Sequence, residues 1–150
     1  RQAEPIGRGY DDGMRVAVEI CKLMDRNPGA KFSDLKKALP KTFSSPTMSP
    51  ACPDTEKYQV LGRIVEKLVK RGEEGGSLGG VKIKEVVTVN GARVILENGG
   101  WGLVRASSNT PNLVVVVESP ESDDQLRAIF KDLDNVIRTE PSVGDYDQTI

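Results

Sequence analysis

One short segment of the chain gathers the residue types that bind anions. Residues 105–111 read Arg-Ala-Ser-Ser-Asn-Thr-Pro and join two apolar runs. A guanidinium stays charged at physiological pH and can contact two phosphate oxygens at once, while hydroxyl and carboxamide groups add further donors. Backbone N–H groups in a tight turn can also converge on an anion. No nucleophile has a base beside it here, so the segment predicts anion binding rather than bond cleavage. The candidate ligands are Arg105, Ser107, Ser108, Asn109 and Thr110.

The same segment also has an ordinary structural interpretation. Ser, Asn and Pro are common turn residues, so residues 105–111 could be only a polar connection between two strands. Its flanks favour a binding loop, because Trp101 precedes it and the run Leu-Val-Val-Val-Val follows it. Rigid strands of this kind hold binding loops in place.

Composition narrows the chemistry available elsewhere in these 150 residues. Histidine is absent, which excludes imidazole acid–base catalysis, Ser-His-Asp and Cys-His nucleophiles, and zinc sites that use His. Cys21 and Cys52 are too few for a disulfide scaffold and too far apart for a metal knuckle. The 21 basic and 22 acidic side chains nearly cancel, so no overall positive field attracts nucleic acid or an anionic membrane.

The first 41 residues predict a linker and a helical arm from a preceding domain. Asp11-Asp12-Gly13 is typical of a helix start, and apolar residues then recur at helical spacing until Asn27-Pro28-Gly29. Cys21 lies in this apolar stripe, so we expect its thiol to be buried. A shorter helix is expected over residues 33–39. Because the chain begins with Arg1 and has no apolar run of the ~18 residues that a membrane helix needs, we expect a piece of a longer cytoplasmic protein.

Residues 42–138 predict an α+β domain. A proline-rich edge segment precedes a helix that Asp54 could cap, and glycine-rich flexible chain follows over residues 72–80. Asn90-Gly91 is a strong hairpin signal, and Ser122 with Gln125 reads as a capping box. We expect an antiparallel four-stranded sheet with two helices on one face, and a flexible tail over residues 139–150. The expected strands span residues 81–89, 92–97, 101–106 and 113–118, and the helices span residues 54–71 and 122–137.

The run Gly-Trp-Gly-Leu-Val-Arg-Ala-Ser-Ser-Asn-Thr-Pro, followed by Leu-Val-Val-Val-Val-Glu, resembles the C-terminal domain of the α-D-phosphohexomutase superfamily. It is most similar to the bacterial phosphomannomutase/phosphoglucomutase branch. Tyr10-Asp11-Asp12-Gly13 is similar to the family sequence that opens the helix between the third and fourth domains. The resemblance extends over about residues 10–138.

This resemblance implies a TATA-binding-protein-like fold and a role in a four-domain enzyme that interconverts hexose 1-phosphate and hexose 6-phosphate of mannose or glucose. Such enzymes use a phosphoserine, Mg²⁺ and a hexose 1,6-bisphosphate intermediate. The fourth domain holds the phosphate that is not being transferred. Arg105 would be its main ligand, Ser107, Ser108 and Asn109 would donate hydrogen bonds, and Thr110 would contribute less.

The resemblance also implies what this chain lacks. The loops that carry the phosphoserine, the metal and the sugar specificity are absent from the sequence, so we expect the chain to be inactive alone, with Mg²⁺ bound outside it. Its expected partners are a phosphosugar and the other domains of the same chain, with no nucleic acid and no membrane.

Two other interpretations of the sequence remain open: one changes the sugar substrate, and the other makes the protein a binding module and not part of an enzyme. The aminosugar branch of the superfamily usually has Arg-x-Ser-Gly-Thr-Glu-Pro, and this chain lacks that Gly and Glu. Ser108 and Asn109 stand where relatives commonly have Asn and Thr, and both keep a donor. A non-enzymatic nucleic-acid or protein-binding module could instead use an exposed sheet face, although Trp101 is the main aromatic residue available there for base stacking.

Overall fold

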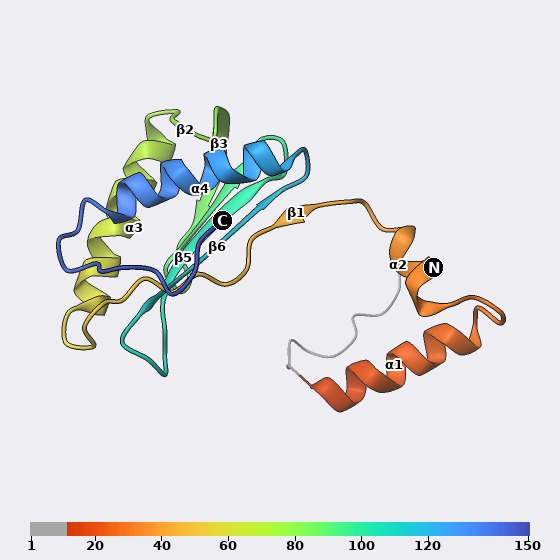
Figure 1. The fold of residues 1–150 in the computed structure, drawn as a ribbon. Coiled ribbons are helices and arrows are strands. Elements are labelled where there is room, and N and C mark those ends of the chain that lie inside the picture. The colour runs from red at the N-terminus through yellow and green to blue at the C-terminus, as the bar shows by residue number, and fades with distance from the viewer. Residues whose placement is uncertain (1–11) are drawn as a thin grey trace. The chain divides into compact units, whose positions relative to one another are not determined.

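The computed structural model describes residues 12–150, which fall into two compact units with a boundary between Pro40 and Lys41 (Figure 1). The first contains α1 (Gly13–Asp25) and α2 (Phe32–Lys37). Asp12 caps α1, because its carboxylate accepts a hydrogen bond from the Arg15 backbone N–H at 3.0 Å. The expected linker over residues 1–9 and the Tyr10-Asp11 part of the family motif lie outside the described residues.

The expected burial of Cys21 is wrong, because its side chain is exposed in the structure. No residue of α1 is buried. The apolar stripe of this helix therefore has too few partners within its own unit to form a core.

The second unit is built on a six-stranded antiparallel sheet in the order β1-β6-β5-β4-β3-β2. The antiparallel α+β class is confirmed, but the expected number of four strands is wrong, because a two-residue strand pairs at each edge. The likeness to a TATA-binding protein stays a prediction. The strands are β1 (Phe43–Ser44), β2 (Ser77–Leu78), β3 (Val81–Val87), β4 (Ala92–Leu96), β5 (Trp101–Ala106) and β6 (Leu113–Ser119).

Strand β2 lies in the glycine-rich stretch that was expected to be flexible. Gly79 and Gly80 both have positive φ, at 56° and 77°, which glycine adopts readily. This turn lets Ser77 and Leu78 pair with Lys82 and Val81, and the Leu78 side chain is fully buried. The two glycines therefore form a tight hairpin and not a linker.

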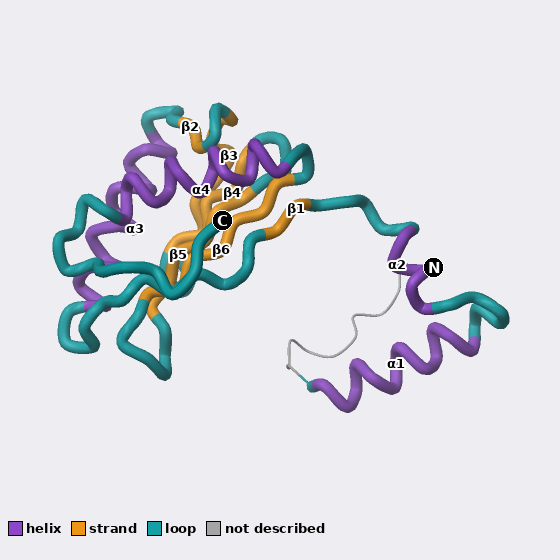
Figure 2. The backbone as a smooth tube through the Cα atoms, viewed as in Figure 1, coloured by secondary structure: helices purple, strands orange, loops and turns teal. Residues whose placement is uncertain are grey.

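Helices α3 (Lys57–Glu73) and α4 (Asp123–Ile137) cover one face of the sheet (Figure 2). Alternation along β5 buries Gly102, Val104 and Ala106, and leaves Trp101, Leu103 and Arg105 partly exposed. Because successive side chains of a strand point to opposite faces, Arg105 belongs to the face that the helices do not cover. The largest fully buried side chains are Met48, Ile64, Leu68, Leu78, Leu96, Leu113, Ile129, Leu133, Ile137, Val60, Val94 and Val104.

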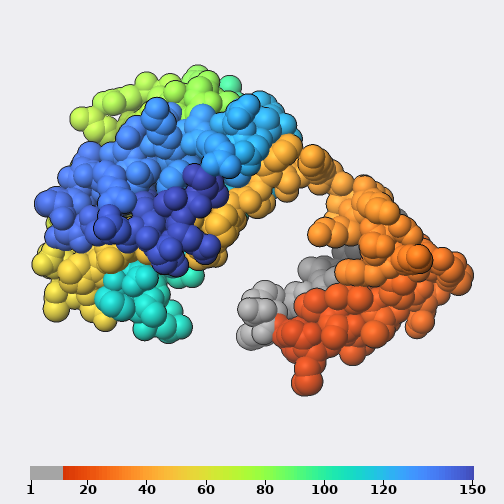
Figure 3. Space-filling model, in the orientation of Figure 1, coloured from red at the N-terminus to blue at the C-terminus, as the bar shows by residue number. Residues whose placement is uncertain are grey.

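Residues 139–150 pack along the second unit (Figure 3), in contrast to the flexible tail that the sequence predicts. Val143 is buried, and the Tyr146 ring meets Phe130 edge-on with 5.6 Å between centroids. The Tyr146 hydroxyl donates to Asp134 at 2.7 Å. Burial, followed by this contact with a carboxylate, raises the pKa of Tyr146, so the phenol stays protonated and continues to donate.

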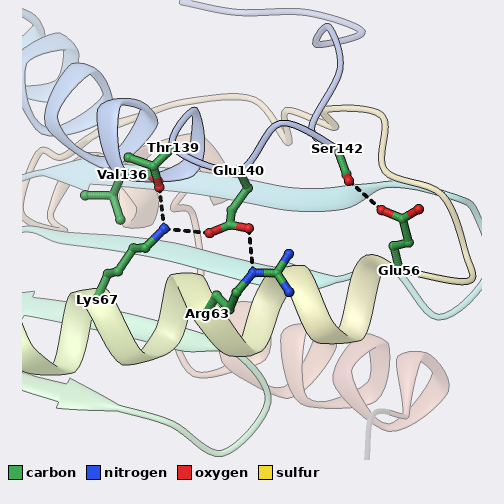
Figure 4. Close-up of polar contacts among 7 residues, drawn as sticks. All are labelled: Glu56, Arg63, Lys67, Val136, Thr139, Glu140 and Ser142. Carbon is green, nitrogen blue, oxygen red and sulfur yellow. Dashed lines mark hydrogen bonds and ion pairs between the residues drawn. The ribbon is translucent and has the colours of Figure 1, made fainter.

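A buried carboxylate fastens this C-terminal segment to α3 (Figure 4). Glu140 is 4% exposed, accepts from Arg63 Nε at 2.7 Å and pairs with Lys67 Nζ at 2.5 Å. Burial alone would raise the pKa of Glu140, but the hydrogen bonds from Lys67 and Arg63 outweigh it and lower that pKa below its usual value. The Ser142 hydroxyl also donates to the Glu56 carboxylate.

Candidate functional site

Three segments meet at one end of the sheet. The β5–β6 loop (residues 107–112) extends beyond that end (Figure 1). The β3–β4 turn lies beside it, because Gly91 is adjacent to the backbone of Val104 and Arg105. The start of α3 reaches it through Lys57, whose Nζ donates to the carbonyl of Thr110 at 3.0 Å. Residues distant in sequence therefore surround the segment that the sequence singles out.

Arg105 is the central cation of this site. It lies near the end of β5 opposite Val114 of β6, and its side chain is partly buried. One guanidinium nitrogen, Nη1, donates to the carbonyl of Ala106 at 3.1 Å. Among residues 12–150 no carboxylate lies within ion-pair distance of it. The remaining N–H groups of the guanidinium are thus available to an anionic ligand.

The Ser107 hydroxyl organises the loop from within. It accepts from the backbone N–H groups of Asn109 and Thr110 at 3.4 and 3.3 Å, and it shares a 2.8 Å hydrogen bond with the Thr110 hydroxyl. The Ser107 N–H donates to the Asn112 carbonyl at 3.0 Å. In this arrangement the Ser107 hydroxyl takes up the N–H groups of Asn109 and Thr110, because serine hydroxyls compete locally for such donors.

The other two predicted ligands lie at the tip of the loop. Ser108 and Asn109 are exposed, and within the part of the chain that the structure describes, their side chains have no hydrogen-bond partner. The five predicted residues therefore divide into two groups. Ser107 and Thr110 hold the shape of the loop, whereas Arg105, Ser108 and Asn109 carry side-chain donors that a ligand could use.

Gly91 belongs to the site in a way that the sequence did not reveal. Its φ is +98°, and a Cβ atom there would lie 2.2 Å from the Val104 carbonyl oxygen and 2.9 Å from the Arg105 Cβ. A glycine is therefore required for the turn to lie against Arg105. The Asn90-Gly91 pair predicts the hairpin, and its cross-strand register could have identified this neighbour.

Lys57 is the second residue that the sequence left unassigned. It lies in the first turn of α3, where a lysine is ordinarily solvated, yet it is buried. Asp54, the expected cap of this helix, instead pairs with Lys57 at 2.6 Å, and Glu56 occupies the N-cap position without a side-chain cap bond. Asp54 therefore forms an ion pair with Lys57 and does not cap the helix.

The described residues do not fit a metal site. Over residues 12–150, no three acidic, cysteine or histidine side chains come together as a group that could hold a metal ion. Over the same range, none of the helices has the length and apolar character needed to cross a membrane.

Comparison with known proteins identifies relatives of this chain in both sequence and structure. A phosphomannomutase/phosphoglucomutase of Pseudomonas syringae pv. tomato is 32% identical over 121 residues, which cover 81% of this chain and 23% of the relative. A phosphopentomutase of Thermococcus kodakarensis is 34% identical over 101 residues, covering 67% of this chain and 20% of the relative. A crystal structure of a phosphoglucomutase/phosphomannomutase family protein from Burkholderia thailandensis has a TM-score of 0.60 and 25% identity, covering 95% of this chain and 27% of that one.

The chain spans 20–27% of the length of these three relatives. Its residues 21–136 match the family model described as the phosphoglucomutase/phosphomannomutase C-terminal domain. That match includes the sheet, most of α4 and the whole candidate loop, and it confirms the resemblance carried by the Arg105 segment. The chain therefore belongs to the family of phosphoglucomutase/phosphomannomutase C-terminal domains.

Proposed function

We propose that residues 42–138 form the substrate-phosphate-binding domain of a phosphohexomutase that interconverts hexose 1-phosphate and hexose 6-phosphate, with mannose or glucose as the sugar. One observation carries this proposal. The Arg105 guanidinium, unpaired with any carboxylate among the described residues, lies at the base of a loop whose tip exposes a hydroxyl and a carboxamide. Donors of these kinds, without a nucleophile or base, suit a phosphate that is held and not transferred.

In this proposal each side chain has a distinct role. Arg105 forms a forked contact to two phosphate oxygens and supplies the positive charge. The Ser108 hydroxyl and the Asn109 carboxamide donate to the remaining oxygens, while Ser107 and Thr110 keep the loop in shape. Because the held phosphate is remote from the reacting one, its binding energy serves to position the sugar for the chemistry.

The chemical steps are assigned to other domains of the same chain. When bound there, Mg²⁺ would neutralise charge on the phosphoryl group that moves between a phosphoserine and the sugar. Hexose 1,6-bisphosphate would be the intermediate. We place the ion outside this domain, where no group of metal-ligating side chains was found among residues 12–150, and we expect the chain alone to be inactive. A cytoplasmic location completes the proposal, and family membership favours a phosphosugar over the nucleic-acid alternative.

A second candidate substrate is a pentose phosphate. The relative from Thermococcus kodakarensis, 34% identical over 101 residues, is a phosphopentomutase. The loop contacts would serve either sugar, since they recognise the phosphate. Mutase assays of the complete enzyme with glucose 1-phosphate, mannose 1-phosphate, glucosamine 1-phosphate and ribose 1-phosphate would separate these possibilities and the aminosugar branch.

The phosphate assignment itself is tested by titrating the isotope-labelled 150-residue chain with glucose 6-phosphate to about 50 mM while recording backbone amide NMR spectra. A single anchored phosphate should give a Kd of ~1–10 mM. We expect shifts centred on residues 105–110 that Arg105→Ala removes. Unshifted loop amides at the end of the titration, or shifts that persist in Arg105→Ala, would contradict the proposal.

A further inference from the structure

Lys57 differs from every other lysine in the chain. It is 4% exposed, whereas all the other lysines are exposed. Lysine is almost never fully buried without a partner, because removing an ammonium from water is costly. Contacts with other polar groups must therefore offset the cost of burying the Lys57 ammonium.

The ammonium of Lys57 has two polar partners from different segments. Its Nζ pairs with Asp54 Oδ1 at 2.6 Å and donates to the Thr110 carbonyl at 3.0 Å. The Asp54 side chain is 65% exposed, so that pair could form equally well with both groups in solvent. The contact with Thr110 is the one that requires the lysine to lie inward, beneath the loop.

Thr110 transmits this contact to the rest of the loop. Its carbonyl also accepts from the Asn112 N–H at 2.8 Å, so both lone pairs have donors. The N–H and hydroxyl of Thr110 both bond to the Ser107 hydroxyl. A continuous set of hydrogen bonds therefore leads from Lys57 through Thr110 to Ser107, two residues after Arg105.

We propose that Lys57 is a positioning residue for the phosphate loop, an inference that rests on the function proposed above. Its ammonium fixes the Thr110 carbonyl, which sets the conformation of residues 107–110 and the placement of the Ser108 and Asn109 donors. Asp54 holds the ammonium in this orientation.

The structure offers a matched control on the same helix. Lys67 also forms an ion pair with a carboxylate, but its partners are Glu140 and Thr139 of the C-terminal segment and not a residue of the loop. Lys57→Met and Lys67→Met each remove one ammonium from α3 while keeping a long apolar side chain. Lys57→Arg keeps the charge and tests for rescue. Thermal unfolding of each variant would establish that it is folded at the titration temperature.

The experiment measures glucose 6-phosphate affinity of the 150-residue chain by amide NMR, with Arg105→Ala as reference. We expect Lys57→Met to weaken binding about tenfold and to shift the Thr110 and Asn112 amides in the free protein. Lys57→Arg should recover part of the affinity, and Lys67→Met should bind as the wild type does.

Two outcomes would overturn the inference while leaving the phosphate-binding function intact. In the first, the wild type binds and Arg105→Ala does not, but Lys57→Met binds normally. In the second, Lys57→Met and Lys67→Met weaken binding equally, which indicates a general stability effect. A wild type whose loop does not respond to glucose 6-phosphate would instead overturn the proposed function and this inference together.

Discussion

The β5–β6 loop and the C-terminal segment are both polar stretches that read as irregular chain, yet they are held in different ways. The loop over residues 107–112 exposes Ser108, Asn109 and Thr110, and hydrogen bonds of the Ser107 and Thr110 hydroxyls, together with one from Lys57, hold its backbone. The segment over residues 139–150 buries Val143 and Glu140 and bonds to elements distant in sequence. A few apolar side chains and one paired carboxylate are sufficient to dock a polar segment, whereas a segment without them stays available to a ligand.

The two segments are nevertheless connected through residues 49–52. Gly144 and Asp145 exchange backbone hydrogen bonds with Ala51, at 2.8 and 3.0 Å. On the other side, the Cys52 N–H donates to the Pro111 carbonyl at 2.8 Å. The docked segment thus supports the end of the loop through one intervening stretch of chain.

The largest expected effect comes from deleting the docked segment. Removing residues 140–150 should lower the free energy of unfolding by about 3–5 kcal/mol, because it exposes core contacts of Val143 and Tyr146 and removes the partner of Arg63 and Lys67. Urea denaturation followed by circular dichroism would measure this. A truncated chain as stable as the full chain would show that the segment contributes no net stability.

Arg105→Ala should instead reduce the activity of the enzyme and leave the stability of the fold nearly unchanged. In the complete enzyme, the fall in kcat/KM should correspond to a loss of at least about 2 kcal/mol in transition-state stabilisation, within the range of charged hydrogen bonds. The free energy of unfolding should change by less than about 1 kcal/mol, because the side chain is not in the core. Steady-state kinetics and urea denaturation of the same variant test both parts. Wild-type kinetics would remove Arg105 from the site.

The sequence predicts the elements better than it predicts these attachments. The four long strands follow from partial alternation, from the unbroken apolar run of residues 113–118 and from the turn signals between them, such as Asn90-Gly91. The helices follow from their apolar periodicity. Periodicity says nothing about partners distant in the chain, so the burial of Lys57 beneath Thr110 and of Glu140 against α3 was not predictable. The edge strand β2 was not predicted, because a glycine-rich sequence suggests flexible chain. The turn forms only because Gly79 and Gly80 adopt positive φ angles, which composition does not indicate.

Tyr146→Phe isolates one polar contact of the docked segment. The substitution removes the hydroxyl that donates to Asp134 and keeps the ring packed against Phe130. We expect a loss of about 1 kcal/mol in unfolding free energy and no change in glucose 6-phosphate affinity. Phe130→Leu, which keeps the hydroxyl contact and removes the aromatic pair, is the matched control. A change in loop affinity in Tyr146→Phe would mean that the two segments are coupled more strongly than their contacts suggest.

The smallest expected effect is the pH dependence that Glu140 adds. Its pKa is lower in the folded protein than its usual value, so the folded state favours the ionised carboxylate. The resulting stability is fully present above the pKa of the unfolded chain and is lost as the pH falls through the lowered, folded-state pKa. Glu140→Gln removes this contribution, so its unfolding free energy should decline less than that of the wild type between pH 7 and about pH 3. Urea denaturation at several pH values measures both slopes. Parallel slopes would mean that Arg63 and Lys67, which are both partly exposed, stabilise the ionised Glu140 no more than water does.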